Sequence, residues 1–158
     1  MTFADSLAYT TNMSGRTRQA TNPCLCDALR QASRAVTRVY DQEMRGVGLR
    51  TTQYALLAWL GHAGQVRQRD LVGLTHLDET TLTRNLSPLI ERGWVGISPG
   101  DDRREKRVRL SAAGAAKLRQ ARPAWDRAQG RMRSRLPKGK WATLMALLPE
   151  LAQLADND

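Results

Sequence analysis

Hydroxyl and guanidinium groups recur at helical spacing between residues 78 and 92 of the 158-residue chain. Thr80, Arg84 and Ser87 fall on one face of the helix that this segment predicts, and Thr81 lies at the edge of that face. An exposed helical face more often carries Glu and Lys. Hydroxyls and arginines form hydrogen bonds with base edges and phosphates, so this face predicts a contact with nucleic acid.

The opposite face of the same segment is apolar, which predicts that it packs against a core. Its apolar positions have the spacing of an amphipathic helix and are Leu82, Leu86, Leu89 and Ile90. Asp78 is expected to cap the start of the helix, and Gly93 supplies the left-handed residue that ends it.

A β-hairpin is expected directly after this helix. Residues 94–98 run as a strand toward Pro99 and Gly100, which signal a turn. In residues 108–110 apolar side chains then alternate with arginine, as in a second strand that runs back from the turn. The tip of the hairpin is strongly charged.

The residues before the helix complete a recognisable motif. Residues 66–77 predict one short helix, with Val66, Leu71 and Leu74 facing inward, that turns directly into the next helix. Two helices joined in this way and followed by strand, basic turn and strand are typical of a winged helix-turn-helix. The expected fold class is therefore mainly α with a small β-wing.

The rest of the chain divides into segments on either side of this motif. Residues 1–21 are polar and predict a flexible N-terminal arm, and residues 22–50 predict a first long helix that begins at Asn22 and Pro23. The winged motif, with a buried helix before it, occupies residues 51–112. Residues 113–158 predict a long helix capped by Ser111, with a kink at Pro123, and a last helix after Pro137.

Both ends of the chain carry apolar side chains that the chain is too short to cover. In the last helix they are Trp141, Leu144, Leu147, Leu148, Leu151 and Leu154, and the first helix has a similar surplus. An uncovered apolar stripe usually meets its counterpart in another subunit. We therefore expect a homodimer formed by residues 22–50 and 113–158, which would place two recognition helices about 34 Å apart or a multiple of it.

Composition narrows the class of protein. The formal net charge of +10 and a pI near 10.7 favour a polyanionic partner, and the excess of arginine over lysine favours phosphate contacts. No signal peptide, membrane-spanning run or disulfide framework is evident, so the expected location is the cytoplasm. No nucleophile with a base, paired carboxylates, metal-ligand cluster or phosphate-binding glycine loop appears. The sequence thus predicts neither an enzyme nor a cofactor.

By its order of parts, the chain resembles the multiple-antibiotic-resistance regulator (MarR) family over roughly residues 22–154. The matching segments are GLRTTQYALLAWL, LDETTLTRNLSPLIERGWV and DDRREKRVRLSAAG. The resemblance implies a homodimer that binds a pseudo-palindromic operator and commonly represses. It also implies that Arg104 enters the minor groove and that Asp102 holds it in position. The DNA-binding residues expected in total are Thr80, Thr81, Arg84, Ser87, Asp102, Arg103 and Arg104.

Two cysteines, Cys24 and Cys26, lie at the start of the first predicted helix, where the helix dipole favours a thiolate. The first helix is similar to that of the organic-hydroperoxide-resistance regulators (OhrR), whose sensing cysteine matches Cys26. The similarity implies that Tyr40 contacts the cysteine of the other subunit. Fourteen residues of helix span about 21 Å, so Cys26 cannot reach Tyr40 of its own helix. Inert packing at a dimer interface and soft-metal binding remain alternatives for the cysteines.

Resemblance to the family also implies a cleft for a small aromatic effector. Tyr40, Trp59 and Trp125 are the candidates to line it, although the same residues at helical spacing would equally suit a core. The leading hypothesis is a transcriptional regulator whose DNA affinity responds to an effector or an oxidant. A non-specific nucleic-acid-binding protein that uses the basic residues 117–140 and a thiol peroxidase that uses Cys26 are the alternatives.

Overall fold

A computed structural model of the protein describes residues 24–100 and 105–156. The chain divides into two compact units, residues 1–35 and residues 36–158. The described residues of the first unit are Cys24 and the part of helix α1 (Leu25–Met44) up to residue 35, and these residues are exposed. The predicted arm at residues 1–21 and the predicted helix start at Asn22 and Pro23 lie outside the described residues. The helix itself begins at Leu25.

The end of α1 is joined to α2 (Thr51–Ala63) by the short 3-10 helix η1 (Arg45–Val47). Gly48 follows η1 with a φ of 69°, a conformation that glycine adopts without strain. Asp41 of α1 caps α2, because its Oδ1 accepts hydrogen bonds from the amide of Thr51 at 2.7 Å and from its hydroxyl at 2.6 Å. The last turn of α1 is thereby tied to the first turn of α2.

The helix-turn-helix consists of α3 (Asp70–Thr75) and α4 (Glu79–Glu91). His76 occupies the turn with a φ of 51°, and Gly93 ends the α4 segment with a φ of 69°, as predicted. The prediction of a single helix over residues 66–77 was wrong at both ends. Val66 lies in a strand, and Leu74, in the last turn of a six-residue helix, is 42% exposed instead of facing the core.

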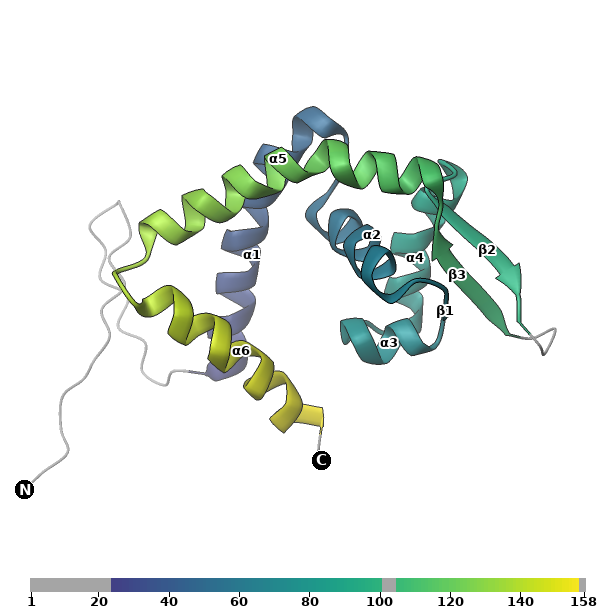
Figure 1. The fold of residues 1–158 in the computed structure, drawn as a ribbon. Helices are drawn as coiled ribbons and strands as arrows, with labels where there is room; N and C mark the ends of the chain where they lie inside the picture. The colour runs from purple at the N-terminus through teal and green to yellow at the C-terminus, as the bar shows by residue number, and fades with distance from the viewer. Residues whose placement is uncertain (1–23, 101–104, 157–158) are drawn as a thin grey trace, which may run out of the picture. The chain divides into compact units, whose positions relative to one another are not determined.

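The wing is a three-stranded antiparallel sheet in the order β1-β3-β2 (Figure 1). Its strands are β1 (Val66–Arg67), β2 (Val95–Pro99) and β3 (Lys106–Leu110). Val108 pairs with Val66 on one side and with Ile97 on the other, so β3 is the central strand. The amide of Gly100 donates to the carbonyl of Glu105 at 2.8 Å, beyond the last paired residues of β2 and β3 on the side of the tip.

One apolar core holds the winged lobe together. It receives side chains from the end of α1, from α2, α3, α4, the sheet and α5, and its largest fully buried members are Met44, Leu56, Leu57, Leu60, Leu71, Leu82, Leu86, Leu89 and Val108. The apolar face predicted for α4 is therefore confirmed. Burying this face forces the opposite, polar face of α4 outward.

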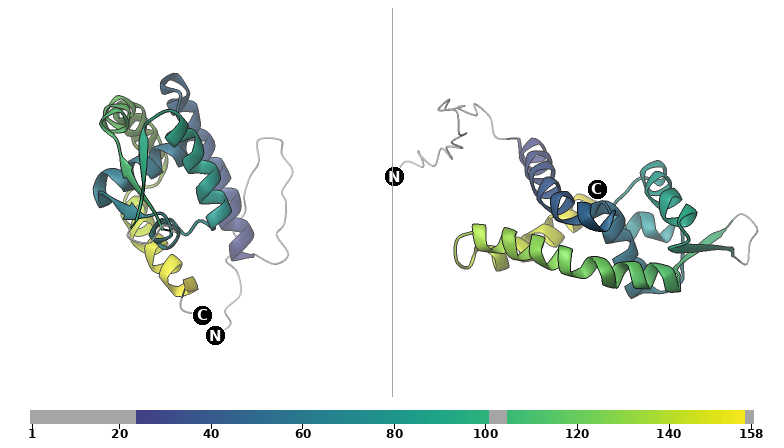
Figure 2. Two further views of the ribbon diagram at one scale, coloured as in Figure 1. Left: turned by 90° about the vertical axis from the view of Figure 1, so that its right-hand side faces the viewer. Right: turned by 90° about the horizontal axis from the view of Figure 1, so that it is seen from above.

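Helix α5 (Ala112–Arg135) leaves the sheet and packs along α2. The Oγ of Ser111 caps it by accepting the Gly114 amide at 2.9 Å. The helical span is unbroken at Pro123, and Figure 2 shows α5 as one long helix. A turn then leads to α6 (Lys140–Asp156). None of the described helices combines the length and the apolar character needed to span a bilayer.

Candidate nucleic-acid interface

The outward face of α4 presents the side chains that the sequence singled out. Thr80 and Arg84 are exposed, whereas Thr81 and Ser87 are half-buried. The hydroxyl of Ser87 donates to the carbonyl of Thr83 at 2.9 Å. Thr80 and Arg84 are therefore the more accessible members of the predicted set.

Asp78 fixes the start of this face. Its Oδ1 accepts the amide of Thr81 at 2.8 Å, and its Oδ2 accepts the hydroxyl of Thr81 at 2.7 Å. These hydrogen bonds, first that from the Thr81 amide, hold the pKa of Asp78 below its ordinary value. Because the hydroxyl hydrogen of Thr81 is used in this way, its oxygen is left to act as an acceptor.

The remaining predicted contacts, Asp102, Arg103 and Arg104, lie outside the described residues. They belong to the segment that joins β2 to β3. Their proposed insertion into a minor groove stays a prediction.

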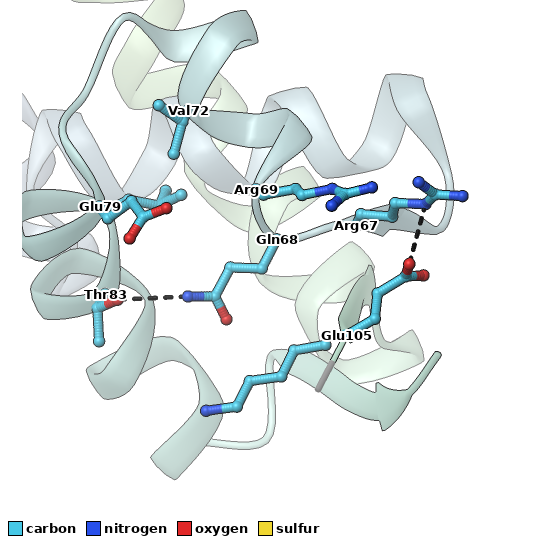
Figure 3. A pocket seen from close by; sticks show the side chains of 9 residues that line it. Arg67, Gln68, Arg69, Val72, Glu79, Thr83 and Glu105 are labelled. Carbon is cyan, nitrogen blue, oxygen red and sulfur yellow. Dashed lines mark hydrogen bonds and ion pairs between the residues drawn. The ribbon is translucent and has the colours of Figure 1, made fainter. Parts of the chain in front are cut away.

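A groove of about 260 Å³, which we call the wing-side groove, separates α4 from β1 and β3 (Figure 3). It is lined by Arg67, Gln68, Arg69, Val72, Glu79, Leu82, Thr83, Glu105 and Lys106. Gln68 joins its two sides, because its backbone amide donates to the carbonyl of Lys106 at 2.8 Å and its Nε2 donates to the Oγ1 of Thr83 at 3.3 Å. Sequence reasoning missed this groove, since no local pattern brings residue 68 to residues 83 and 106.

Glu105 pairs with two arginines near the tip end of the wing. Its carboxylate lies 3.3 Å from Nε of Arg67 and 3.0 Å from Nε of Arg107, and its side chain is only 15% exposed. Since Arg67 lies on β1 and Arg107 on β3, the carboxylate ties the two strands together. One of the two dashed lines in Figure 3 marks the ion pair of Arg67 with Glu105.

A second groove, of about 370 Å³, lies between α2 and α5. Its lining residues are Thr51, Tyr54, Ala55, Ala58, Trp59, His62, Arg122 and Trp125. The Tyr54 and Trp125 rings stack with centroids 6.0 Å apart, and the guanidinium of Arg122 lies 4.8 Å from the Trp125 ring centroid. Burial raises the pKa of Tyr54, so its phenol stays neutral near pH 7.

This α2–α5 groove contains two of the three residues predicted to line an effector cleft. Trp59 and Trp125 are among its lining residues, and Tyr40 is not. The hydroxyl of Tyr40 instead donates to Oε1 of Gln129, in α5 of the same chain, and burial raises its pKa. Tyr54 and Arg122 complete the groove and were missed, because sequence alone does not show which faces of two helices meet.

Both cysteines are exposed free thiols at the start of α1. The carbonyl of Cys24 accepts the amide of Ala28 at 3.0 Å, so Cys24 occupies the position just before the helix and Cys26 lies in its first turn. Among the described residues, no group of three or more His, Cys, Asp or Glu side chains gathers as a metal site would require.

The three-helix lobe, the antiparallel wing and the polar outward face of α4 define a winged helix-turn-helix protein. Residues 47–105 match the model of the MarR family. The DNA complex of the M. tuberculosis transcriptional regulator MOSR has 32% sequence identity and a TM-score of 0.77, over 85% of this chain and 97% of that one. A probable transcriptional regulator from Pseudomonas aeruginosa has 32% identity and a TM-score of 0.72, over 80% of this chain and 96% of that one.

A curated relative supports the same assignment. The HTH-type transcriptional regulator YwoH of Bacillus subtilis is 29% identical over 90 residues, which is 57% of this chain and 66% of that protein. The match thus spans just under two thirds of the relative's length. The chain belongs to the MarR family of transcriptional regulators. Because its relatives are regulators, it is not an enzyme, and the alternative of a thiol peroxidase is set aside.

Proposed function

We propose that the protein is a repressor that binds a pseudo-palindromic operator as a homodimer and acts in the cytoplasm. In this proposal the lobe at residues 51–112 binds the DNA, while residues 22–50 and 113–158 form the dimer. The observation that carries the proposal is the outward face of α4, where Thr80 and Arg84 are exposed above a fully buried apolar face. The related MOSR was crystallised with DNA, which supports duplex DNA as the partner.

Each base contact has a physical basis. Arg84 can donate two parallel hydrogen bonds to a guanine, and the hydroxyls of Thr80, Thr81 and Ser87 suit base edges or phosphates. Arg104, supported by Asp102 and accompanied by Arg103, would enter the neighbouring minor groove, where negative potential is concentrated.

The homodimer is supported by the apolar surface that α1 and α6 leave exposed. The exposed side chains are Leu25, Leu29 and Val36 on α1, and Leu144, Met145, Leu147, Leu148 and Leu154 on α6. Exposed apolar side chains along a helix are costly in water and are usually covered by a partner. A second copy supplies the same stripes and creates two recognition helices for a two-fold operator.

We further propose that a small aromatic effector lowers DNA affinity by binding in the α2–α5 groove. The stacked Tyr54 and Trp125 rings and the exposed Trp59 ring offer flat apolar surfaces, and Arg122 offers a donor beside them. An effector there would favour an arrangement of the dimer in which the recognition helices no longer match the operator.

Oxidation of Cys26, alone or with Cys24, is the second candidate signal, supported by the exposure of both thiols at a helix start. In the dimer, Tyr40 of the other subunit would be its neighbour. If oxidation is the signal, peroxide should weaken operator binding by the wild-type protein and leave that of Cys26→Ser unchanged. If the thiols are inert, peroxide should change neither.

The decisive experiment is selection of bound sequences from random duplex DNA, with and without peroxide. Recovery of one pseudo-palindrome, with half-site centres about 34 Å apart or a multiple of that, supports the proposal. Recovery of no common sequence, together with steep salt dependence of binding, would instead identify a non-specific nucleic-acid-binding protein.

A further inference from the structure

The wing-side groove lies where a DNA backbone would have to pass. In the proposed complex α4 occupies a major groove and the wing reaches the neighbouring minor groove, and one sugar-phosphate strand separates these two grooves. Residues from α4, from the segment after β1 and from the wing line the space between them, and Figure 3 shows Gln68 reaching across it to Thr83, with Arg67 and Arg69 extending on the other side.

The charged residues that line the groove are not equivalent. Arg67, Arg69 and Lys106 contribute positive charge, and Glu79 and Glu105 contribute negative charge. Glu105 is engaged by Arg67 at 3.3 Å and by Arg107 at 3.0 Å, so its charge is balanced within the protein. Arg67 and Arg107 each form an ion pair with Glu105.

Arg69 and Lys106 differ from this pair. The side chain of Arg69 is 67% exposed, and its nearest acidic partner, Asp70, lies at the limit of an ion pair, 3.9 Å away. Lys106 is exposed and forms no ion pair with any carboxylate in the described ranges 24–100 and 105–156. These two cations can therefore turn to an external anion without breaking a strong internal interaction.

Gln68 sets the distance between the two walls. Its backbone amide is bonded to Lys106 of β3, while its side chain is bonded to Thr83 of α4. One remaining side-chain N–H of Gln68 is able to donate to an anion in the groove. The groove thus contains two cations, Arg69 and Lys106, and one neutral hydrogen-bond donor, Gln68. Gln68 is hydrogen-bonded to both α4 and β3.

Building on the DNA binding proposed above, we propose that the wing-side groove holds one backbone phosphate of the operator in each protomer. Arg69 and Lys106 neutralise the phosphate, and Gln68 holds α4 and the wing at the spacing that admits it. Glu105 keeps Arg67 and Arg107 as structural cations that make no phosphate contact. Glu79, the one carboxylate in the groove without a described basic partner, limits how strongly the groove binds phosphate.

The first test measures how the affinity for the selected operator depends on salt. The slope of log K against log salt becomes shallower by about 0.9 for each phosphate that is no longer neutralised, so Arg69→Gln/Lys106→Gln should reduce it by about 1.8 for a dimer. Arg133→Gln/Lys138→Gln removes the same number of charges from two exposed positions outside the groove, one in the last turn of α5 and one in the turn that follows α5, and should leave the slope unchanged. Arg67→Gln should also leave the slope unchanged. Arg67→Lys, which keeps a positive charge beside Glu105, should leave it unchanged as well.

The second test locates the phosphate by replacing operator phosphates one at a time with neutral methylphosphonate. One position per half-site should weaken binding by wild type but not by Arg69→Gln/Lys106→Gln. The assignment would be overturned if the Arg69/Lys106 variant showed no reduction of the slope. It would also be overturned if the Arg133/Lys138 control, or Arg67→Gln, reduced the slope as much as the Arg69/Lys106 variant does. If the wild-type protein binds no DNA at all, the proposed function is wrong. If wild type binds the operator but the variants behave as described above, only the phosphate site is wrong.

Discussion

Asp78 and Thr81 are joined by two hydrogen bonds at the first turn of the recognition helix, at 2.8 Å from the Thr81 amide and 2.7 Å from its hydroxyl. One carboxylate therefore satisfies an otherwise unpaired amide of the helix start and orients a side chain of the DNA-facing surface. The stability of α4 and the geometry of its outward face depend on the same residue.

This relationship predicts a pH dependence. The pKa of Asp78 is lowered in the folded protein. The ionised carboxylate therefore stabilises the fold at pH values above its ordinary pKa of about 3.8. That contribution is lost as the pH falls through the lower, folded-state pKa. Thermal unfolding of wild type and Asp78→Asn should differ at pH 7 and converge at strongly acidic pH. A difference that stays constant over this range would count against the cap.

Arg84 is predicted to carry base recognition. Arg84→Ala should weaken binding to the selected operator by about 1–3 kcal/mol and flatten the base preference at one position of each half-site. Arg133→Ala, an exposed arginine at the end of α5, is the matched control and should bind as wild type does. Equal losses of affinity in both variants, measured by titration of labelled operator, would mean that Arg84 acts only through its charge.

Gly114 is predicted to be required for packing. A Cβ at this position would overlap the carbonyl oxygen of Trp94, which is backbone and cannot move aside freely. Gly114→Ala should therefore lower the free energy of unfolding by about 1–3 kcal/mol. Gly130→Ala lies in the same helix with open space around it and should be neutral or stabilising by up to about 1 kcal/mol. Denaturant titrations of the two variants should rank them in this order.

Leu147 is predicted to lie in the dimer interface. It is 55% exposed on α6 of the isolated chain. Losing a buried leucine costs about 1.5–3 kcal/mol, and a symmetric interface loses it twice, so Leu147→Asp should weaken dimerisation by about 3–6 kcal/mol. Gln153→Asp adds the same carboxylate at another exposed position of α6. Sedimentation should show dissociation of the first variant alone, and a dimer that survives Leu147→Asp would place the interface elsewhere.

The parts of the fold that the sequence predicted are those determined by local chemistry. The α4 helix, with its Asp78 cap, its Gly93 end and its two faces, depends on residues within a few turns of one another. Ser111 at the start of α5 is a similar case. Helical spacing and capping express these features directly, which is why they could be predicted correctly.

Features that depend on distant partners were missed. Strand β1 is two residues long and exists because Val66 pairs with Val108, more than forty positions later. The wing-side groove requires the same pairing. The stacking of Tyr54 on Trp125 likewise depends on how α2 meets α5, and the hydrogen bond from Tyr40 to Gln129 depends on a partner far along the chain. Sequence periodicity fixes a face but not its partner.

The most direct test of the central claim places a DNA-cleaving group on the outward face of α4. Thr80→Cys, in a protein that also carries Cys24→Ser and Cys26→Ser, would be conjugated to an iron chelate and bound to the selected operator. We predict two focused cleavage sites related by the operator's symmetry, about 34 Å apart or a multiple of it, and none from the same conjugate at Gln153→Cys. Cleavage spread evenly along the DNA, or identical patterns from the two conjugates, would contradict the placement of α4 in the major groove.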